Sequence, residues 1–214
     1  NSKDLRAVQH VAELTAMGVH SLKIEGRTKS PYYVARTAQV YRRAIDDAVA
    51  GRPFNEALLQ ELNGMANRGF TEGFLRRHVS QSELHNYATS HSEGEQQFVG
   101  EFTGNTEVRS GMTYAEVDVK NRFALGDRLV LMTTAGNHHF TLEQLHDKQG
   151  LNIGAAPGSG HMVWLPIPTP NGDSEVLPLA HAMLLRQLYV VAEPELETVL
   201  GHETVDQIAI TEVR

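Results

Sequence analysis

The chain has 214 residues, of which 41% are hydrophobic and 21% charged, as is ordinary for a soluble globular protein. This length allows one large domain or two small ones. The sequence has no cysteine, which excludes disulfides, thiolate nucleophiles and thiolate-held zinc or iron–sulfur centres within these residues. No apolar run approaches the roughly 18 residues that a membrane-spanning helix needs, so we expect no membrane insertion and a cytoplasmic protein.

The net charge of −7 is unevenly distributed along the chain. Residues 1–80 carry 12 basic and 8 acidic side chains, whereas residues 81–214 carry 7 and 18. Such asymmetry suggests two modules with different partners. The acidic residues 81–214 would repel the phosphates of a nucleic acid, whereas the basic residues 1–80 could contact them.

The first 80 residues predict mainly helices. Ser2 is a plausible N-cap for a helix that ends near Met17. Residues Val19–Ile24 then predict a short strand, and the Glu-Gly-Arg turn after it leads into a helix that begins at Pro31 and ends before Gly51. A third helix is expected after residue 55. A strand, a turn and a helix in this order form one βα unit of an enzyme domain, which suggests that the chain is the back part of a longer protein.

Residues 81–96 are polar and predict a linker, after which the hydrophobic period changes from helical to two. Many short strands at even spacing predict a small antiparallel barrel or sandwich over residues 97–190. Residues 191–214 form an acidic tail with no assigned role. The predicted strands are Phe98–Phe102, Met112–Val119, Arg128–Met132, His139–Leu145, Leu151–Ala155, His161–Ile167 and Ala182–Leu188.

Several long segments occur together in one order: NSKDLRA, GVHSLKIEGRTKS, RGFTEGFLRRH, QQFVGEFTG, VKNRFALGDRLVLMT, APGSG and VWLPIP. In these segments the chain resembles the collagenase-like peptidase family, peptidase U32, and within it a bacterial tRNA-hydroxylation subgroup that is often labelled a protease. The resemblance runs from residue 1 to about residue 188. Residues 123–168 also resemble the second-domain barrel of translation elongation factors.

The family resemblance implies a fold and an activity. The strand pattern predicts the small antiparallel β-barrel of an α+β chain, and the resemblance implies that residues 1–80 are the helical end of a (β/α)-barrel enzyme domain. The resemblance also implies an upstream cysteine cluster that can hold an iron–sulfur centre. The subgroup implies 5-hydroxylation of the wobble uridine of tRNA, with prephenate, a small carboxylate, as a linked metabolite. The peptidase label implies metal-dependent collagenolysis, and a non-catalytic binding module is a third possibility.

Glu25 and Arg27 follow the predicted strand, at the end where βα barrels carry their active sites. Glu25 could act as a ligand or base, and Arg27 could bind a carboxylate or phosphate. The structural alternative is an ion pair between them that fixes the turn. A barrel strand without neighbours would also favour self-association.

Arginines make the front of the chain basic and are candidates for RNA contact, because guanidinium groups bind phosphates. The alternative is a solvated helix face. These candidates are Arg36, Arg42, Arg43, Arg68, Arg76 and Arg77.

The eleven histidines show no metal-binding spacing, and adjacent His138 and His139 should point to opposite faces, so no metal site is predicted. Trp164 is the only tryptophan and alternates with Val163 and Leu165. It could be a core residue or a binding platform, and the core assignment is favoured.

Overall fold

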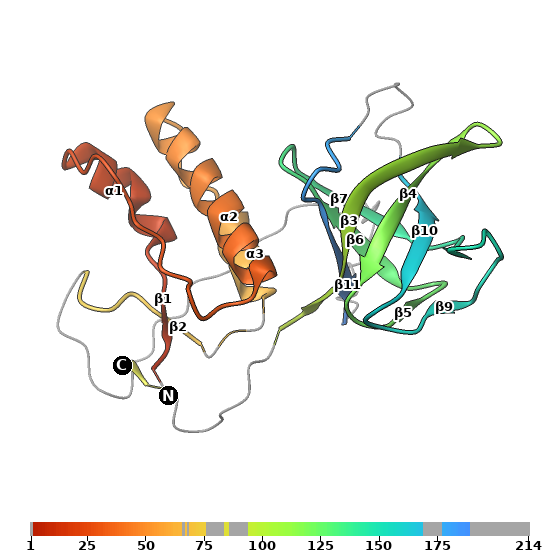
Figure 1. Ribbon diagram of the computed structural model, residues 1–214. Coiled ribbons are helices and arrows are strands. Elements are labelled where there is room, and N and C mark those ends of the chain that lie inside the picture. The colour runs from red at the N-terminus through yellow and green to blue at the C-terminus, as the bar shows by residue number, and fades with distance from the viewer. Residues whose placement is uncertain are drawn as a thin grey trace, which may run out of the picture.

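The structure, a computed structural model, describes residues 2–65, 67, 69–75, 84–85, 94–168 and 177–188. The described residues between 2 and 75 form a layer of helices, called the helical layer here, and those between 96 and 187 form a β-rich part, called the β-module (Figure 1). The chain is therefore α+β, as predicted. Most of the predicted linker, Arg68, Arg76, Arg77 and the whole acidic tail lie outside the described residues.

The helical layer is organised around one long helix whose ends follow from the sequence. Helix α2 begins at Pro31, and the Ser30 side chain accepts a hydrogen bond from the backbone N–H of Tyr33 at 3.2 Å. This N-cap with a proline in the first turn is the predicted arrangement, and it is confirmed. The elements of the layer are β1 (Asp4–Leu5), a 3₁₀ turn (Val8–His10), α1 (Val11–Ala16), α2 (Pro31–Val49), α3 (Ala57–Asn63) and β2 (Phe70–Thr71).

Two predictions for the start of the chain are wrong. The predicted helix over residues 2–17 begins only at the 3₁₀ turn, because β1 pairs in parallel with β2 from much later in the chain. The predicted strand Val19–Ile24 does not form, and Val19 and Ile24 remain 42% and 40% exposed. A strand needs a partner for its backbone, and the described residues provide none at this place. The predicted self-association through this strand therefore loses its basis in strand pairing.

The β-module contains one seven-stranded sheet and one two-stranded sheet, all of whose pairings are antiparallel. The large sheet has the order β7-β6-β11-β3-β4-β10-β8. Among the described residues no pairing joins β7 to β8, so closure into a barrel stays a prediction. The strands are β3 (Gln96–Arg109), β4 (Met112–Val119), β5 (Phe123–Ala124), β6 (Arg128–Met132), β7 (Asn137–Thr141), β8 (His146–Asp147), β9 (Ala155–Ala156), β10 (Met162–Pro166) and β11 (Met183–Gln187).

Strand β3 is much longer than predicted. The predicted strand ends at Phe102, but β3 continues through Gly104 and Asn105 to Arg109. The register with β4 shifts between Phe102 and Thr106, which marks an irregularity of the β-bulge kind. Gly104 has φ +92°, a conformation that glycine adopts at little cost.

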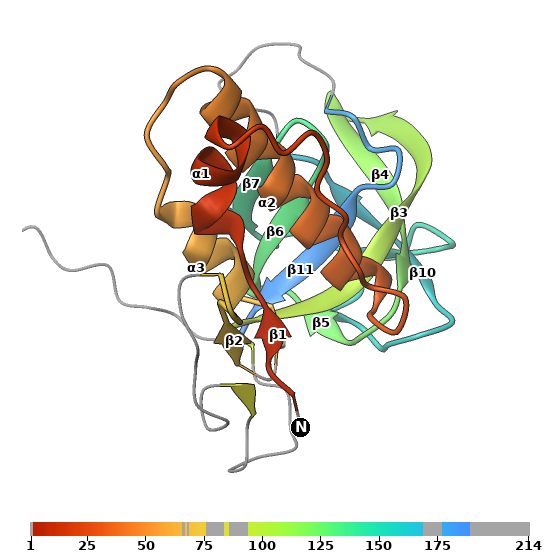
Figure 2. The same ribbon diagram turned by 90° about the vertical axis from the view of Figure 1, so that its left-hand side faces the viewer.

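Two apolar cores hold the chain together. The inner core lies within the β-module and includes Val117, Phe123 and Leu165. The second, called the shared core, lies between the helical layer and the outer face of β6 and β11, over which the helices are seen in Figure 2. Its members are Val8, Val11, Tyr32, Val40, Ala44, Leu58, Leu62, Met65, Val130, Met132, Met183 and Leu185.

None of the helices in the described part of the chain is both long and apolar enough to cross a membrane.

Gly100 in β3 permits close contact with β4. A Cβ atom there would lie 2.4 Å from Cγ1 of Val117 and 3.2 Å from the carbonyl oxygen of Asp118. We expect Gly100→Ala to lower the free energy of unfolding by about 1–3 kcal/mol, because the added methyl group would overpack the contact between β3 and β4. Urea denaturation measures this change.

Gly154→Ala is the matched control. The space around Gly154 is open to 4 Å and its φ lies outside the left-handed range, so its effect should stay within about 0.5 kcal/mol. Equal effects of the two substitutions would contradict the packing described for β3 and β4.

Candidate functional site

The turn with Glu25 and Arg27 is exposed to solvent. The backbone N–H of Arg27 donates a hydrogen bond to Glu25 Oε1 at 3.3 Å, and Lys23 Nζ lies 4.0 Å from Glu25 Oε2. An ion pair between the Glu25 and Arg27 side chains is not among those formed in the described part of the chain. Both charged groups therefore face solvent, where they could meet a ligand.

The turn is tied to β1 and α2 behind it. Lys29 Nζ donates to both carboxylate oxygens of Asp4, at 2.7 and 2.8 Å, and the Tyr33 hydroxyl donates to Asp4 Oδ2 at 3.0 Å. Burial, and then the Asp4 carboxylate, raise the pKa of Tyr33, so this hydroxyl stays protonated. Gly26 packs closely on α2, since a Cβ there would lie 3.0 Å from Val34 Cγ2. These contacts fix the position of Glu25 and Arg27 from behind.

A second polar cluster lies past the carboxyl ends of β1 and β2, and the sequence analysis missed it. His10 is only 3% exposed, its Nε2 lies 3.2 Å from Glu72 Oε2, and its Nδ1 lies 3.4 Å from Glu13 Oε2. Gln9 donates to the other Glu72 oxygen at 2.8 Å. The carboxyl ends of parallel strands are where α/β proteins bind ligands. A carboxylate held by a buried imidazole can accept or deliver a proton.

Arg36 is not on the surface, although it was predicted to contact RNA. It is 1% exposed, and its guanidinium donates to Glu61 Oε2 at 3.3 Å and to Gln39 Oε1 at 2.9 Å. Glu61 also accepts from Asn137 at 3.2 Å and pairs with Arg43. Arg36 therefore belongs to a polar network between α2, α3 and the start of β7, and as placed it offers no surface contact to a phosphate.

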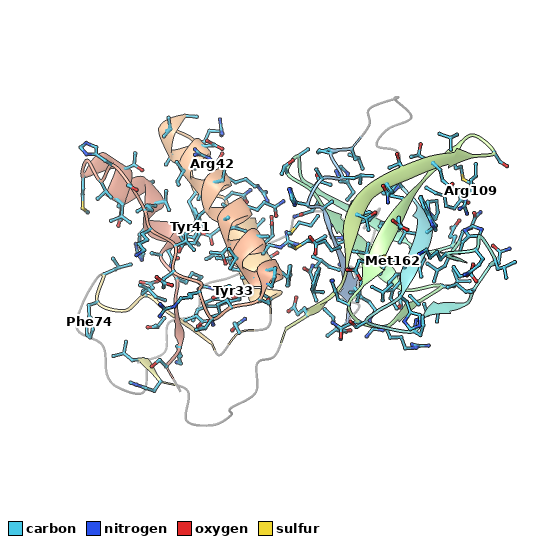
Figure 3. All side chains as sticks on the ribbon, viewed as in Figure 1. Tyr33, Tyr41, Arg42, Phe74, Arg109 and Met162 are labelled. Atoms are coloured by element: carbon cyan, nitrogen blue, oxygen red, sulfur yellow. The ribbon has the colours of Figure 1, made fainter. Side chains whose placement is uncertain are left out.

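The other described arginine candidates remain accessible. Arg42 is exposed on α2, as Figure 3 shows, and its Nε donates to Asp46 Oδ2 at 3.1 Å. The Arg43 side chain is 44% exposed while it pairs with Glu61. Exposed ion pairs are weak, so a phosphate could compete for both guanidinium groups. RNA contact stays a prediction for these two residues.

Among the described residues, no three His, Asp or Glu side chains are grouped so that they could hold a metal ion. Trp164 differs from its favoured prediction: Val163 and Leu165 are buried in the inner core, while Trp164 lies on the outer face of β10 and is only partly buried. The side chains alternate as predicted, but the tryptophan is on the opposite face.

Two family models match the chain in consecutive segments. The model of Peptidase family U32 matches residues 1–85, and the model of the Peptidase family U32 C-terminal domain matches residues 94–186. The chain belongs to peptidase family U32. The U32 model covers the helical layer and the U32 C-terminal model covers nearly all of the β-module.

Known relatives of this U32 chain carry two kinds of name. It is 57% identical over 187 residues to tRNA hydroxylation protein P of Escherichia coli, covering 87% of this chain and 39% of that protein. The protein of the same name from Haemophilus influenzae is 54% identical and is covered to the same 39%. A collagenase of Porphyromonas gingivalis is 26% identical over 133 residues, which are 60% of this chain and 36% of that protein. The chain thus spans about two fifths of the length of these curated relatives.

The solved C-terminal domain of a U32 peptidase from Geobacillus thermoleovorans shares 20% identity and a TM-score of 0.34 with the chain. The match covers 42% of this chain and 91% of that domain.

Glu61 should be more important for stability than the exposed carboxylates, because its loss leaves the buried Arg36 charge poorly paired. We expect Glu61→Gln to lower the free energy of unfolding by about 3 kcal/mol, whereas Asp46→Asn, in the exposed pair with Arg42, should cost less than about 1 kcal/mol. Combining Glu61→Gln with Arg36→Met should recover part of the loss.

Urea denaturation of the four proteins, including the wild type, measures these changes. An effect of Glu61→Gln no larger than that of Asp46→Asn would contradict the buried network.

Proposed function

We propose that this chain is the C-terminal part of a U32 protein that takes part in tRNA hydroxylation, at carbon 5 of the wobble uridine. The observation that carries the proposal is the 57% identity over 187 residues to tRNA hydroxylation protein P of Escherichia coli. Because this identity extends through both family segments, the helical layer and the β-module are related to that protein together.

The two parts have different tasks in this proposal. The helical layer supplies one rim of the active site through Glu25 and Arg27, and Arg42 and Arg43 offer positive charge further along α2. The β-module binds tRNA or a small ligand, and its curved sheet closes into a barrel around the inner core. The support for these tasks is that both site residues face solvent on a turn anchored by Lys29.

The cofactor and the small molecule belong to the same proposal. An iron–sulfur centre would be held elsewhere in the whole protein, since this chain has no cysteine and supplies no thiolate ligand. A small carboxylate such as prephenate would suit Arg27, because a guanidinium binds a carboxylate with two parallel hydrogen bonds.

A peptidase is the weaker alternative. The relatives that are named collagenase or protease are 26–28% identical, about half the identity of the tRNA hydroxylation proteins. A non-catalytic binding module is the third alternative, and it would retain RNA binding without any dependence of hydroxylation on Glu25.

A chimera tests the proposal. Residues 1–188 replace the matching segment of the Escherichia coli protein in a strain that lacks that protein, and hydroxylated uridine is measured in digested tRNA by mass spectrometry. We expect the chimera to restore hydroxylation. Glu25→Gln and Arg27→Gln should each lower it at least about tenfold, the loss expected when a group that acts in the transition state is removed.

Lys23→Gln, an exposed neighbour of the same turn, is the control and should leave hydroxylation unchanged. A soluble chimera that yields no hydroxylated uridine would contradict the proposal.

A further inference from the structure

An aromatic surface lies on the face of the β-module opposite the inner core. Trp164 on β10 pairs across the sheet with Glu116 on β4 and with His146 on β8. Tyr114, two residues before Glu116, therefore shares the face of Trp164, and its ring meets the His146 ring edge-on with 5.2 Å between centroids. Trp164 is only partly buried, so part of its ring is open to contact with a ligand.

Arg109 lies over both aromatic rings. Its guanidinium carbon is 5.1 Å from the centre of the Tyr114 ring and 5.5 Å from that of Trp164. It also pairs with Glu107 on the same strand. A planar, delocalised cation that rests on an indole shows that flat groups fit against this surface.

Tyr114 is only 3% exposed and its hydroxyl donates to Gln144, so it forms the buried floor of this surface, while the helices lie over β6 and β11 instead. The helices lie on the other side of the β-module, and Arg109 projects from the β3–β4 hairpin at the far end (Figures 1 and 3). Met112, opposite Arg109 in the hairpin, is 42% exposed. Met162 precedes Trp164 by two residues and extends the same face. Arg109, Met112, Tyr114, Met162 and Trp164 are called the Trp164 platform below.

We propose that the Trp164 platform binds an unpaired base of a single-stranded RNA loop by stacking, with the indole on one side and the Arg109 guanidinium on the other. This inference rests on the proposed role in tRNA hydroxylation. Proteins bind single-stranded RNA by stacking bases on aromatic rings and arginine planes, and loops are where bases are available for this. The long Arg109 side chain leaves the indole and closes over the base.

The charges around the platform favour a base over a phosphate chain. Glu107 and Glu116 lie beside the aromatic rings, Arg109 lies over both rings, and His146 meets the Tyr114 ring. The platform therefore contributes stacking energy and few phosphate contacts, so its share of the affinity depends weakly on salt. Phosphate contacts would come from the basic helical layer.

Trp164 itself reports the binding, because it is the only tryptophan of the chain. The probe is a hairpin RNA with a single-stranded loop, and a blunt duplex of the same length is the control. We expect the hairpin to quench the tryptophan emission of the full chain and the duplex to leave it nearly unchanged. Stacking of one base is worth about 1–3 kcal/mol, so Trp164→Leu should weaken hairpin binding roughly 5- to 150-fold in fluorescence anisotropy.

Matched variants separate stacking from charge and from folding. Trp164→Phe keeps a flat ring and should retain most of the affinity, which shows that the protein is folded. Arg109→Gln should reduce the quenching of Trp164. Arg128→Gln removes the same charge from an exposed site on β6, away from the platform, and should leave the quenching unchanged.

Two results would overturn the inference. Hairpin RNA could bind without quenching and with equal affinity for Trp164→Leu, which would leave the proposed tRNA role intact and place the RNA elsewhere. Alternatively, prephenate could quench Trp164 while hairpin RNA does not, which would make the platform a metabolite site. Hydroxylation by the chimera tests the proposed function separately from either result.

Discussion

The outer face of β6 and β11 cannot be left in water, and the rest of the structure depends on how it is covered. Val130, Met132, Met183 and Leu185 present apolar side chains on this face, and the helices bury them in the shared core. The two family segments meet near residues 86–93, and residues from both of them build the shared core. Under the proposed function, a ligand bound by the β-module would be held at a fixed geometry to the turn with Glu25 and Arg27.

Local sequence signals predicted the elements that depend on local structure. The N-cap at Ser30 and the glycine after residue 50 define α2, and the apolar patterns of residues 112–119 and 128–132 predicted β4 and β6 with their observed bounds. The failures involve partners distant in sequence. Residues Val19–Ile24 have the composition of a strand but no neighbour, and β1 is a strand only because β2 lies beside it. The strand predicted to end at Phe102 continues through Gly104, because β3 stays paired with β4 across a register shift.

The candidate site was predicted in the same uneven way. Glu25 and Arg27 were named from the sequence because they flank Gly26 in one turn; the structure shows that the turn is exposed, and their role stays a prediction. The contact between His10 and Glu72 could not be found, because it exists only after β1 and β2 have paired. The number of arginines suggested a basic face, but burial by α3 and the β7 hairpin removes Arg36 from it. The sequence pattern correctly placed Trp164 on the opposite side of the strand from Val163 and Leu165. It could not tell which side faces the core, since tertiary packing decides which face of a strand is covered.

Native-state hydrogen exchange tests most directly whether the helical layer and the β-module are one unit. Amides of α2, such as those of Val40 and Ala44, and amides of β11, such as those of Leu184 and Leu185, are compared at increasing urea concentrations. If the shared core joins the two parts, both groups exchange through one opening with the same free energy and the same dependence on urea. If α2 opens at a clearly lower free energy while β11 stays protected, the shared core does not couple them, and the fixed geometry between the rim and the β-module is contradicted.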